Sequence, residues 1–142
     1  IMILASEDIG NADPQALQVA VAAAQAVERV GMPESQIILS QAVTYMACAP
    51  KSNSAVNAIF DAMASVKNTE TTVPVHLQDA HYGGHEKLGK GIGYKYAHDY
   101  PGHYVKQQYL PSEIQNEQFY EPGELGYEKN IREYLQKTKW RN

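Results

Sequence analysis

The residues from Gly84 to Gly91 have the spacing of a phosphate-binding loop. In the run Gly-His-Glu-Lys-Leu-Gly-Lys-Gly, two glycines and Lys90 stand where a loop of the pattern G-x-x-x-x-G-K-[ST] holds nucleotide phosphates. Gly91 replaces the final Ser or Thr, which would bind magnesium. Such a loop also needs a buried strand before it and a stable helix after it, but polar residues precede this one and a glycine-rich run follows it. We therefore expect no nucleotide site here.

Histidines are a second group of residues that could do chemistry, because all five lie within one short window. Two of them, four residues apart, would suit a zinc site if they lay on a helix. The intervening Tyr82-Gly83-Gly84 disfavours that helix, and no cysteine joins the group. We expect these histidines to bind backbone groups, with a metal-dependent enzyme as the competing hypothesis. The five are His76, His81, His85, His98 and His103.

Lysines and tyrosines gather in residues 81–109. This window holds four basic and two acidic residues, whereas residues 1–80 hold three basic and eight acidic ones. Lysines beside aromatic rings suit phosphate contact and base stacking. The competing interpretation is that the tyrosines pack a segment poor in aliphatic residues while the lysines are simply solvated. The candidate DNA-binding residues are Lys87, Lys90, Lys95, Lys106, Tyr94 and Tyr96.

Motifs of nucleophilic catalysis are missing from the sequence. Serines and threonines fall mostly at expected caps and turns, and neither a G-x-S-x-G pattern nor a pair of catalytic carboxylates is present. The 142 residues thus give no sign of an enzyme, and we predict no catalytic residue, cofactor or metal.

The first half of the chain is predicted to consist of helices. Asp13-Pro14 predicts a helix start and Gly31 its end, with apolar residues on most of its sides. A second helix should end before Pro50, and a third should run from residue 52 or 53 to about 68. Three amphipathic helices with short turns predict an antiparallel bundle. Their apolar stripes, including Val56, Ile59, Phe60, Met63 and Val66 on the third, should be core first and partner surface second.

The second half should be rich in loops. Residues 73–77 are predicted to be extended, residues 81–111 to form an ordered loop, and Pro111-Ser112-Glu113 to start a short helix. The last helix should pack Tyr127, Ile131, Tyr134, Leu135 and Thr138 while Glu128–Arg132 and Glu133–Lys137 pair on its wet side. We predict an all-α fold forming one domain over residues 1–142, divided into a helical bundle (1–68) and a loop-rich segment with a final helix (69–142).

Composition narrows the class of protein. Apolar residues make up 44% of the chain and charged residues 20%, with a net charge of −4, which disfavours nucleic-acid binding over the whole surface. The one cysteine, Cys48, excludes an intrachain disulfide, and we expect it to be buried. No signal peptide or membrane span is evident. The apolar start Ile1–Ala5 looks like half of a helix, so we expect the native chain to continue upstream.

Three stretches of the sequence resemble one known family. They are Ala5-Ser6-Glu7-Asp8-Ile9-Gly10-Asn11-Ala12-Asp13-Pro14, the run from Ala20 to Pro50 continued by Lys51-Ser52-Asn53, and Gly91-Ile92-Gly93-Tyr94-Lys95-Tyr96-Ala97-His98-Asp99-Tyr100 with Gln107-Gln108-Tyr109-Leu110-Pro111. Together they span nearly the whole chain. The sequence is similar to the C-terminal region of the RarA/MgsA-type AAA+ ATPases, also called the Werner-helicase-interacting-protein family.

This resemblance implies a role that the residues alone do not. In that family an AAA+ ATPase module comes first, and a helical region similar to the clamp-loader collar then holds a homotetramer. The resemblance implies work at replication forks in repair and recombination, a cytoplasmic, nucleoid-associated location, and DNA and single-strand-binding protein as partners. ATP and magnesium are expected only in the ATPase module, whose motifs are absent from these residues. The alternative is a stand-alone nucleic-acid-binding module that uses residues 81–109.

Overall fold

The computed structural model describes residues 1–78 and 91–138, which form helices and loops without a strand. The predicted all-α class is confirmed. The chain divides into two compact units: Ile1–Asp61 together with Phe119–Asn142, and Ala62–Gln118. The first unit is therefore built from both ends of the chain. Within the described residues, no helix is long and apolar enough to cross a membrane.

The N-terminal segment is helical but irregular. Helix α1 (Met2–Leu4) continues into a π-helical turn, η1 (Ala5–Ile9), and then into a 3₁₀ turn, η2 (Gly10–Ala12). Ala5, Ile9 and Ala12 are buried, while the residues of α1 are exposed. The segment thus packs through one narrow face.

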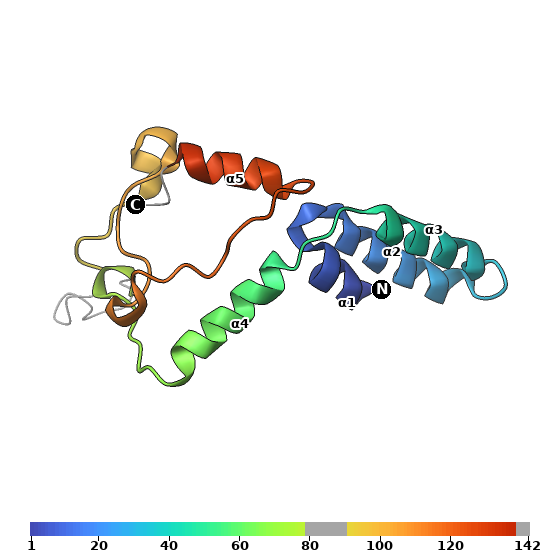
Figure 1. Cartoon of the computed structure of the whole chain (residues 1–142), viewed down its shortest axis with the longest axis horizontal. Helices are drawn as coiled ribbons and strands as arrows, with labels where there is room; N and C mark the ends of the chain where they lie inside the picture. The colour runs from blue at the N-terminus through green and yellow to red at the C-terminus, as the bar shows by residue number, and fades with distance from the viewer. Residues whose placement is uncertain (79–90, 139–142) are drawn as a thin grey trace. The chain divides into compact units, whose positions relative to one another are not determined.

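Helices α2 (Gln15–Val30) and α3 (Ser35–Cys48) form an antiparallel hairpin (Figure 1). The carboxylate of Asp13 accepts the amide hydrogen of Gln15 at 3.1 Å, which satisfies a free donor of the first turn. At the other end Gly31 has a φ of 74°, and its N–H donates to the carbonyl of Val27. The Asp-Pro start and the glycine stop of this helix are both confirmed.

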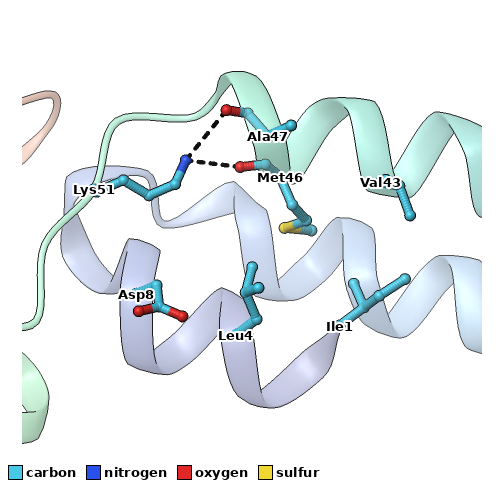
Figure 2. Close-up of a pocket in the computed structure, with 7 residues that line it drawn as sticks. All are labelled: Ile1, Leu4, Asp8, Val43, Met46, Ala47 and Lys51. Atoms are coloured by element: carbon cyan, nitrogen blue, oxygen red, sulfur yellow. Dashed lines mark hydrogen bonds between the residues drawn. The ribbon is translucent and has the colours of Figure 1, made fainter.

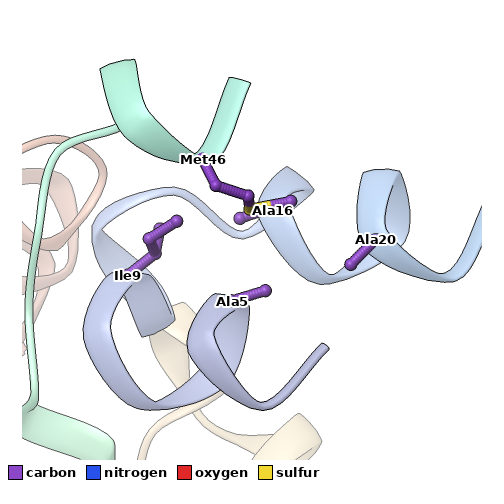
Figure 3. Close-up of a cluster of buried hydrophobic side chains, with 5 residues drawn as sticks. All are labelled: Ala5, Ile9, Ala16, Ala20 and Met46. Carbon is purple, nitrogen blue, oxygen red and sulfur yellow. The ribbon is translucent and has the colours of Figure 1, made fainter. Parts of the chain in front are cut away.

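The core of the first unit lies where the N-terminal segment meets the hairpin (Figure 3). Alanines allow the helix backbones to approach closely, and Met46 fills the remaining space because its unbranched side chain adapts to irregular gaps. The cluster consists of Ala5, Ile9, Ala16, Ala20 and Met46.

Helix α4 (Ser54–Lys67) corrects part of the predicted packing. Its limits agree with the sequence, but its apolar stripe is not core: Phe60 is 65% exposed and Met63 60%. The apolar spacing is real, so periodicity identified the helix but could not tell which surface covers it. Cys48 is likewise exposed rather than buried.

In the second unit, the described residues beyond α4 form loops and single turns, as predicted. The turns are η3 (Val75–Leu77), η5 (Ala97–Asp99), η6 (Pro101–His103) and η7 (Ser112–Ile114). Residues 75–77 form a 3₁₀ turn rather than the extended chain expected there. Val105 and Ile114 are the buried apolar anchors among these loops.

Helix α5 (Glu128–Lys137) returns the chain to the first unit with a different buried face from the predicted one. Glu128, expected on the wet side with Arg132, is wholly buried. Arg132 instead pairs with Glu124 at 2.8 Å and also donates to the carbonyl of Pro122. Tyr134 is 58% exposed rather than packed. The buried face of α5 therefore includes Glu128, because hydrogen-bond donors surround its carboxylate there.

Candidate functional site

Hydrogen bonds from the side chain of Gln107 hold the described part of the predicted DNA-binding segment, residues 91–109, in shape. Gln107 accepts the backbone N–H of Lys95 at 3.1 Å and donates its own amide hydrogen to the carbonyl of Lys95 at 2.9 Å. The pair of bonds replaces one step of a strand ladder, so residues 94–96 lie beside residues 106–108. Val105, next to Lys106 in the chain, is buried and anchors the backbone at that position, while Lys106 itself is exposed.

The turn at Val75–Leu77 supports the same segment through two further hydrogen bonds. His76 donates from Nε2 to the carbonyl of Gln108 at 2.8 Å, and the N–H of Gly91 donates to the carbonyl of Val75 at 2.9 Å. His76 therefore does what was predicted for the histidines in general: it binds a backbone group.

Aromatic rings meet on the surface of this segment. The ring centroids of Tyr96 and His98 are 5.0 Å apart, and those of His98 and His103 are 4.9 Å apart. All three residues are exposed. No sequence pattern predicts that two histidines five residues apart meet, because the contact depends on the turn at Gly102 and His103, both with positive φ.

Four of the six predicted DNA-binding residues can be placed. Tyr94 and Tyr96 are about half exposed, and Lys95 and Lys106 are exposed. The remaining predictions lie outside the described residues, namely Lys87, Lys90, the phosphate-loop-like run and the pair His81 and His85. In the part of the chain that the structure describes, no three His, Cys, Asp or Glu side chains are grouped as metal ligands.

A second kind of candidate site is an apolar groove between the N-terminal segment and α3 (Figure 2). Its volume is about 440 Å³. Lys51 closes one end and donates from Nζ to the carbonyls of Met46 at 2.8 Å and Ala47 at 3.4 Å, which are free acceptors at the end of α3. The lining residues are Ile1, Leu4, Asp8, Val43, Met46, Ala47 and Lys51.

Another groove runs between the N-terminal segment and the first turns of α4. Its volume is about 540 Å³, and Ile3, Ile59 and Phe60 on its walls are all more than half exposed. Leu17 brings α2 into the same groove. We call these residues, together with Met2 and Val56, the α4 groove. Large apolar side chains gathered in a groove are unusual on a monomer and mark an interaction surface.

Among the residues that the structure describes, Glu128 is the one fully buried carboxylate, and it joins α5 to the N-terminal part of the first unit. Its Oε2 accepts hydrogen bonds from Ser52 Oγ and the N–H of Gly123, both at 2.7 Å. Its Oε1 accepts from the hydroxyls of Ser54 and Tyr120, the latter at 3.1 Å. Burial favours a raised pKa, but these four donors outweigh it and hold the pKa of Glu128 below its usual range. Sequence reasoning missed this contact.

The described residues thus combine a helical hairpin flanked by apolar grooves with a loop segment that carries lysines and aromatic rings. Comparison with known proteins gives the family. Residues 1–139 match the family model described as the MgsA AAA+ ATPase C terminal, and the chain belongs to that family. The predicted resemblance is confirmed.

Curated relatives agree with this assignment. The chain is 47% identical over 127 residues to replication-associated recombination protein A of Bacillus subtilis and 42% identical over 136 residues to the protein of that name in Escherichia coli. It is 51% identical over 132 residues to an AAA domain-containing protein of Mycobacterium tuberculosis. These matches cover 89%, 94% and 92% of the chain, but only 30%, 30% and 29% of the relatives.

Proposed function

We propose that this chain is the assembly module of an AAA+ ATPase that acts in replication-associated recombination. In this role it holds copies of the protein together as a homo-oligomer, a tetramer by family resemblance, and performs no ATP hydrolysis itself. The family match supports the context. The observation that carries the assembly role is the α4 groove, whose apolar side chains stay exposed in the single chain.

A second copy is the occupant that best fits this groove. Its walls combine Met, Ile, Leu and Phe side chains with only one charged residue, Glu7, and oligomer interfaces are more apolar than other protein surfaces. Four different elements contribute to it: α1, η1, α2 and α4. Because α1, η1 and α2 pack on one another, this side of the groove keeps its shape and little ordering of it would oppose association.

Light scattering coupled to size exclusion tests the assembly role. The 142-residue chain should elute as a multimer, and replacing Ile59 and Phe60 together by serine should give a monomer with unchanged helical circular dichroism. The matched control is Tyr134→Ser, since Tyr134 is equally exposed but lies on α5 outside the groove. A parent chain that is monomeric at tens of micromolar would contradict the proposal.

DNA engagement is a second function, favoured by residues 94–108. Hydrogen bonds of Gln107 and His76 brace this segment, which carries Lys95, Lys106 and exposed tyrosines. Phosphate contacts by lysines make affinity fall with rising salt. Replacing Lys95 and Lys106 by alanine should therefore weaken DNA binding and reduce its salt dependence, by about one unit of the log–log slope for each lysine. Lys129→Ala and Lys137→Ala on α5 are the control. Unchanged binding and slope in the first double variant would argue against this function. Single-strand-binding protein remains a proposed partner on resemblance alone.

A further inference from the structure

Tyr96, His98 and His103 form a continuous run of exposed rings in which each contacts the next. The first two rings are inclined at 44° and the second pair at 50°. Aromatic rings that stabilise a domain are normally buried, whereas Tyr96 is 54% exposed and both histidines are exposed. The run therefore contributes little to a core and leaves aromatic surface open to a ligand.

The backbone holds His103 in a conformation that a histidine adopts at a cost. Its φ is 54°, and the preceding Gly102 also has a positive φ, of 70°. Residues other than glycine are uncommon in this region and often mark a functional constraint. Here the turn returns the chain so that the ring of His103 reaches His98. The contact between the rings of His98 and His103 therefore lies on the surface and not in a core.

Positive charge lies along the same segment. Lys95 is next to Tyr96 in the chain, and the two hydrogen bonds between Lys95 and Gln107 bring Lys106 onto the neighbouring stretch of backbone. Asp99 is the single acidic residue in residues 91–110. Rings and lysines on one braced segment match a ligand that alternates flat π surfaces with anionic groups.

We propose that Tyr96, His98 and His103 form a stacking site for an unpaired nucleobase, with Lys95 and Lys106 contacting the adjoining phosphates. The ligand is single-stranded DNA, because the faces of bases inside a duplex are already covered by their neighbours. Stacking accepts every base, so the site has little sequence preference. This inference rests on the proposed DNA engagement and adds the form of DNA and the residues that select it.

A comparison of two strands separates stacking from charge. Fluorescence anisotropy is measured with a labelled oligothymidylate of about 15 nucleotides, within the usual range of single-strand site sizes, and with an abasic strand of the same length. Both carry the same phosphates, but one has no bases. The parent chain should bind the oligothymidylate about tenfold more tightly than the abasic strand, a modest effect for base–aromatic stacking.

Ring removal should abolish this preference. Tyr96→Leu combined with His98→Leu should bind the two strands equally, with affinity for the abasic strand unchanged. Tyr96→Phe, which keeps a ring, should retain the preference, as should the control Tyr134→Leu on α5. Unchanged circular dichroism would show that the leucine variant is folded, as expected for exposed positions.

The outcomes distinguish the two proposals. Equal binding of both strands by the parent chain, or a preference that survives in the leucine variant, overturns the stacking site and leaves DNA engagement standing. Binding to neither strand overturns both. Tighter binding to a duplex of the same length would also overturn the choice of single-stranded DNA.

Discussion

Ser52 donates a hydrogen bond to the carboxylate of Glu128 at 2.7 Å, joining residues 76 positions apart in the chain. Ser52 lies in the linker between α3 and α4, and Glu128 begins α5. The same carboxylate receives the N–H of Gly123 and the hydroxyls of Ser54 and Tyr120. One buried anion thus holds the C-terminal helix to the N-terminal half of its unit. A buried charge of this kind is stable only when its acceptors are satisfied.

Glu128→Gln should lower the free energy of unfolding by about 1–3 kcal/mol, the range for losing hydrogen bonds to a charged group. The amide would place two donors among groups that now all donate. The hydroxyls of Ser54 and Tyr120 can turn to accept, but the N–H of Gly123 cannot. Urea denaturation followed by circular dichroism measures the change. Glu133→Gln, at an exposed position of the same helix, should stay within about 0.5 kcal/mol, and an equal cost at both positions would contradict the role of Glu128.

The pH dependence of stability should carry the signature of the same carboxylate. The pKa of Glu128 is lowered in the folded chain, so the folded state favours the ionised form. Its stabilising contribution is complete above the unfolded-state pKa, about 4.3 for glutamate, and is lost as the pH falls through the lower folded-state pKa. Urea titrations between neutral and acid pH should therefore show a steeper acid loss for the parent chain than for Glu128→Gln. Parallel curves would contradict this assignment.

Gly126→Ala should be costlier than Gly31→Ala, although both glycines have positive φ. A Cβ at Gly31 meets nothing within 4 Å, so the cost comes only from its backbone (φ 74°, ψ −176°), a conformation essentially restricted to glycine that costs about 1–3 kcal/mol. At Gly126 the Cβ would lie 2.0 Å from the carbonyl oxygen of Ala12, which also accepts the N–H of Tyr127 at 2.7 Å. Loss of that bond adds about 1 kcal/mol or more. Thermal or urea unfolding compares the pair, and equal costs would show that the close contact is not needed.

Tyr45→Phe should lower the free energy of unfolding slightly, because it removes one hydrogen bond. The Tyr45 hydroxyl donates to Asp13 at 2.7 Å and so ties α3 to the start of α2. The hydrogen bond to Asp13, then burial and the negative charge of Asp13, raise the pKa of Tyr45. Since its neutral form is favoured, this stability is present below the unfolded-state pKa and is lost as the pH rises through the folded-state value. A difference titration of phenolate absorbance between parent and variant should show one tyrosine ionising late.

Local signals in the sequence predicted the helices well. The Asp-Pro start, the stop at Gly31 and the break before Pro50 act within a turn of the chain, so they survive whatever packs around them. The loop-rich character of residues 91–111 followed from the same reasoning. The family was recognised from longer stretches, and the comparisons confirm it.

Burial was harder to predict, because it depends on contacts between residues far apart in sequence. An apolar stripe such as Ile59, Phe60 and Met63 has the same spacing whether it faces a core or another protein. Glu128 looked like one partner of a surface pair until Ser52 and Ser54 were placed beside it. The contact of His98 with His103 needed two residues with positive φ, of which one is not glycine. Lys95 and Tyr96, both predicted to bind DNA, are exposed on the segment that Gln107 holds in place.

The return of α5 to the first unit sets an order of events during synthesis. Ser52 and Ser54 leave the ribosome long before Glu128, and the Asn11–Tyr120 hydrogen bond spans 109 positions. Contacts that distant form late, because a long loop must close before they repay its entropy. The hydroxyls of Ser52 and Ser54 therefore stay open to water until Glu128 has emerged from the ribosome. The first unit is incomplete during this interval, and incompletely packed intermediates of this kind are the species that molecular chaperones protect.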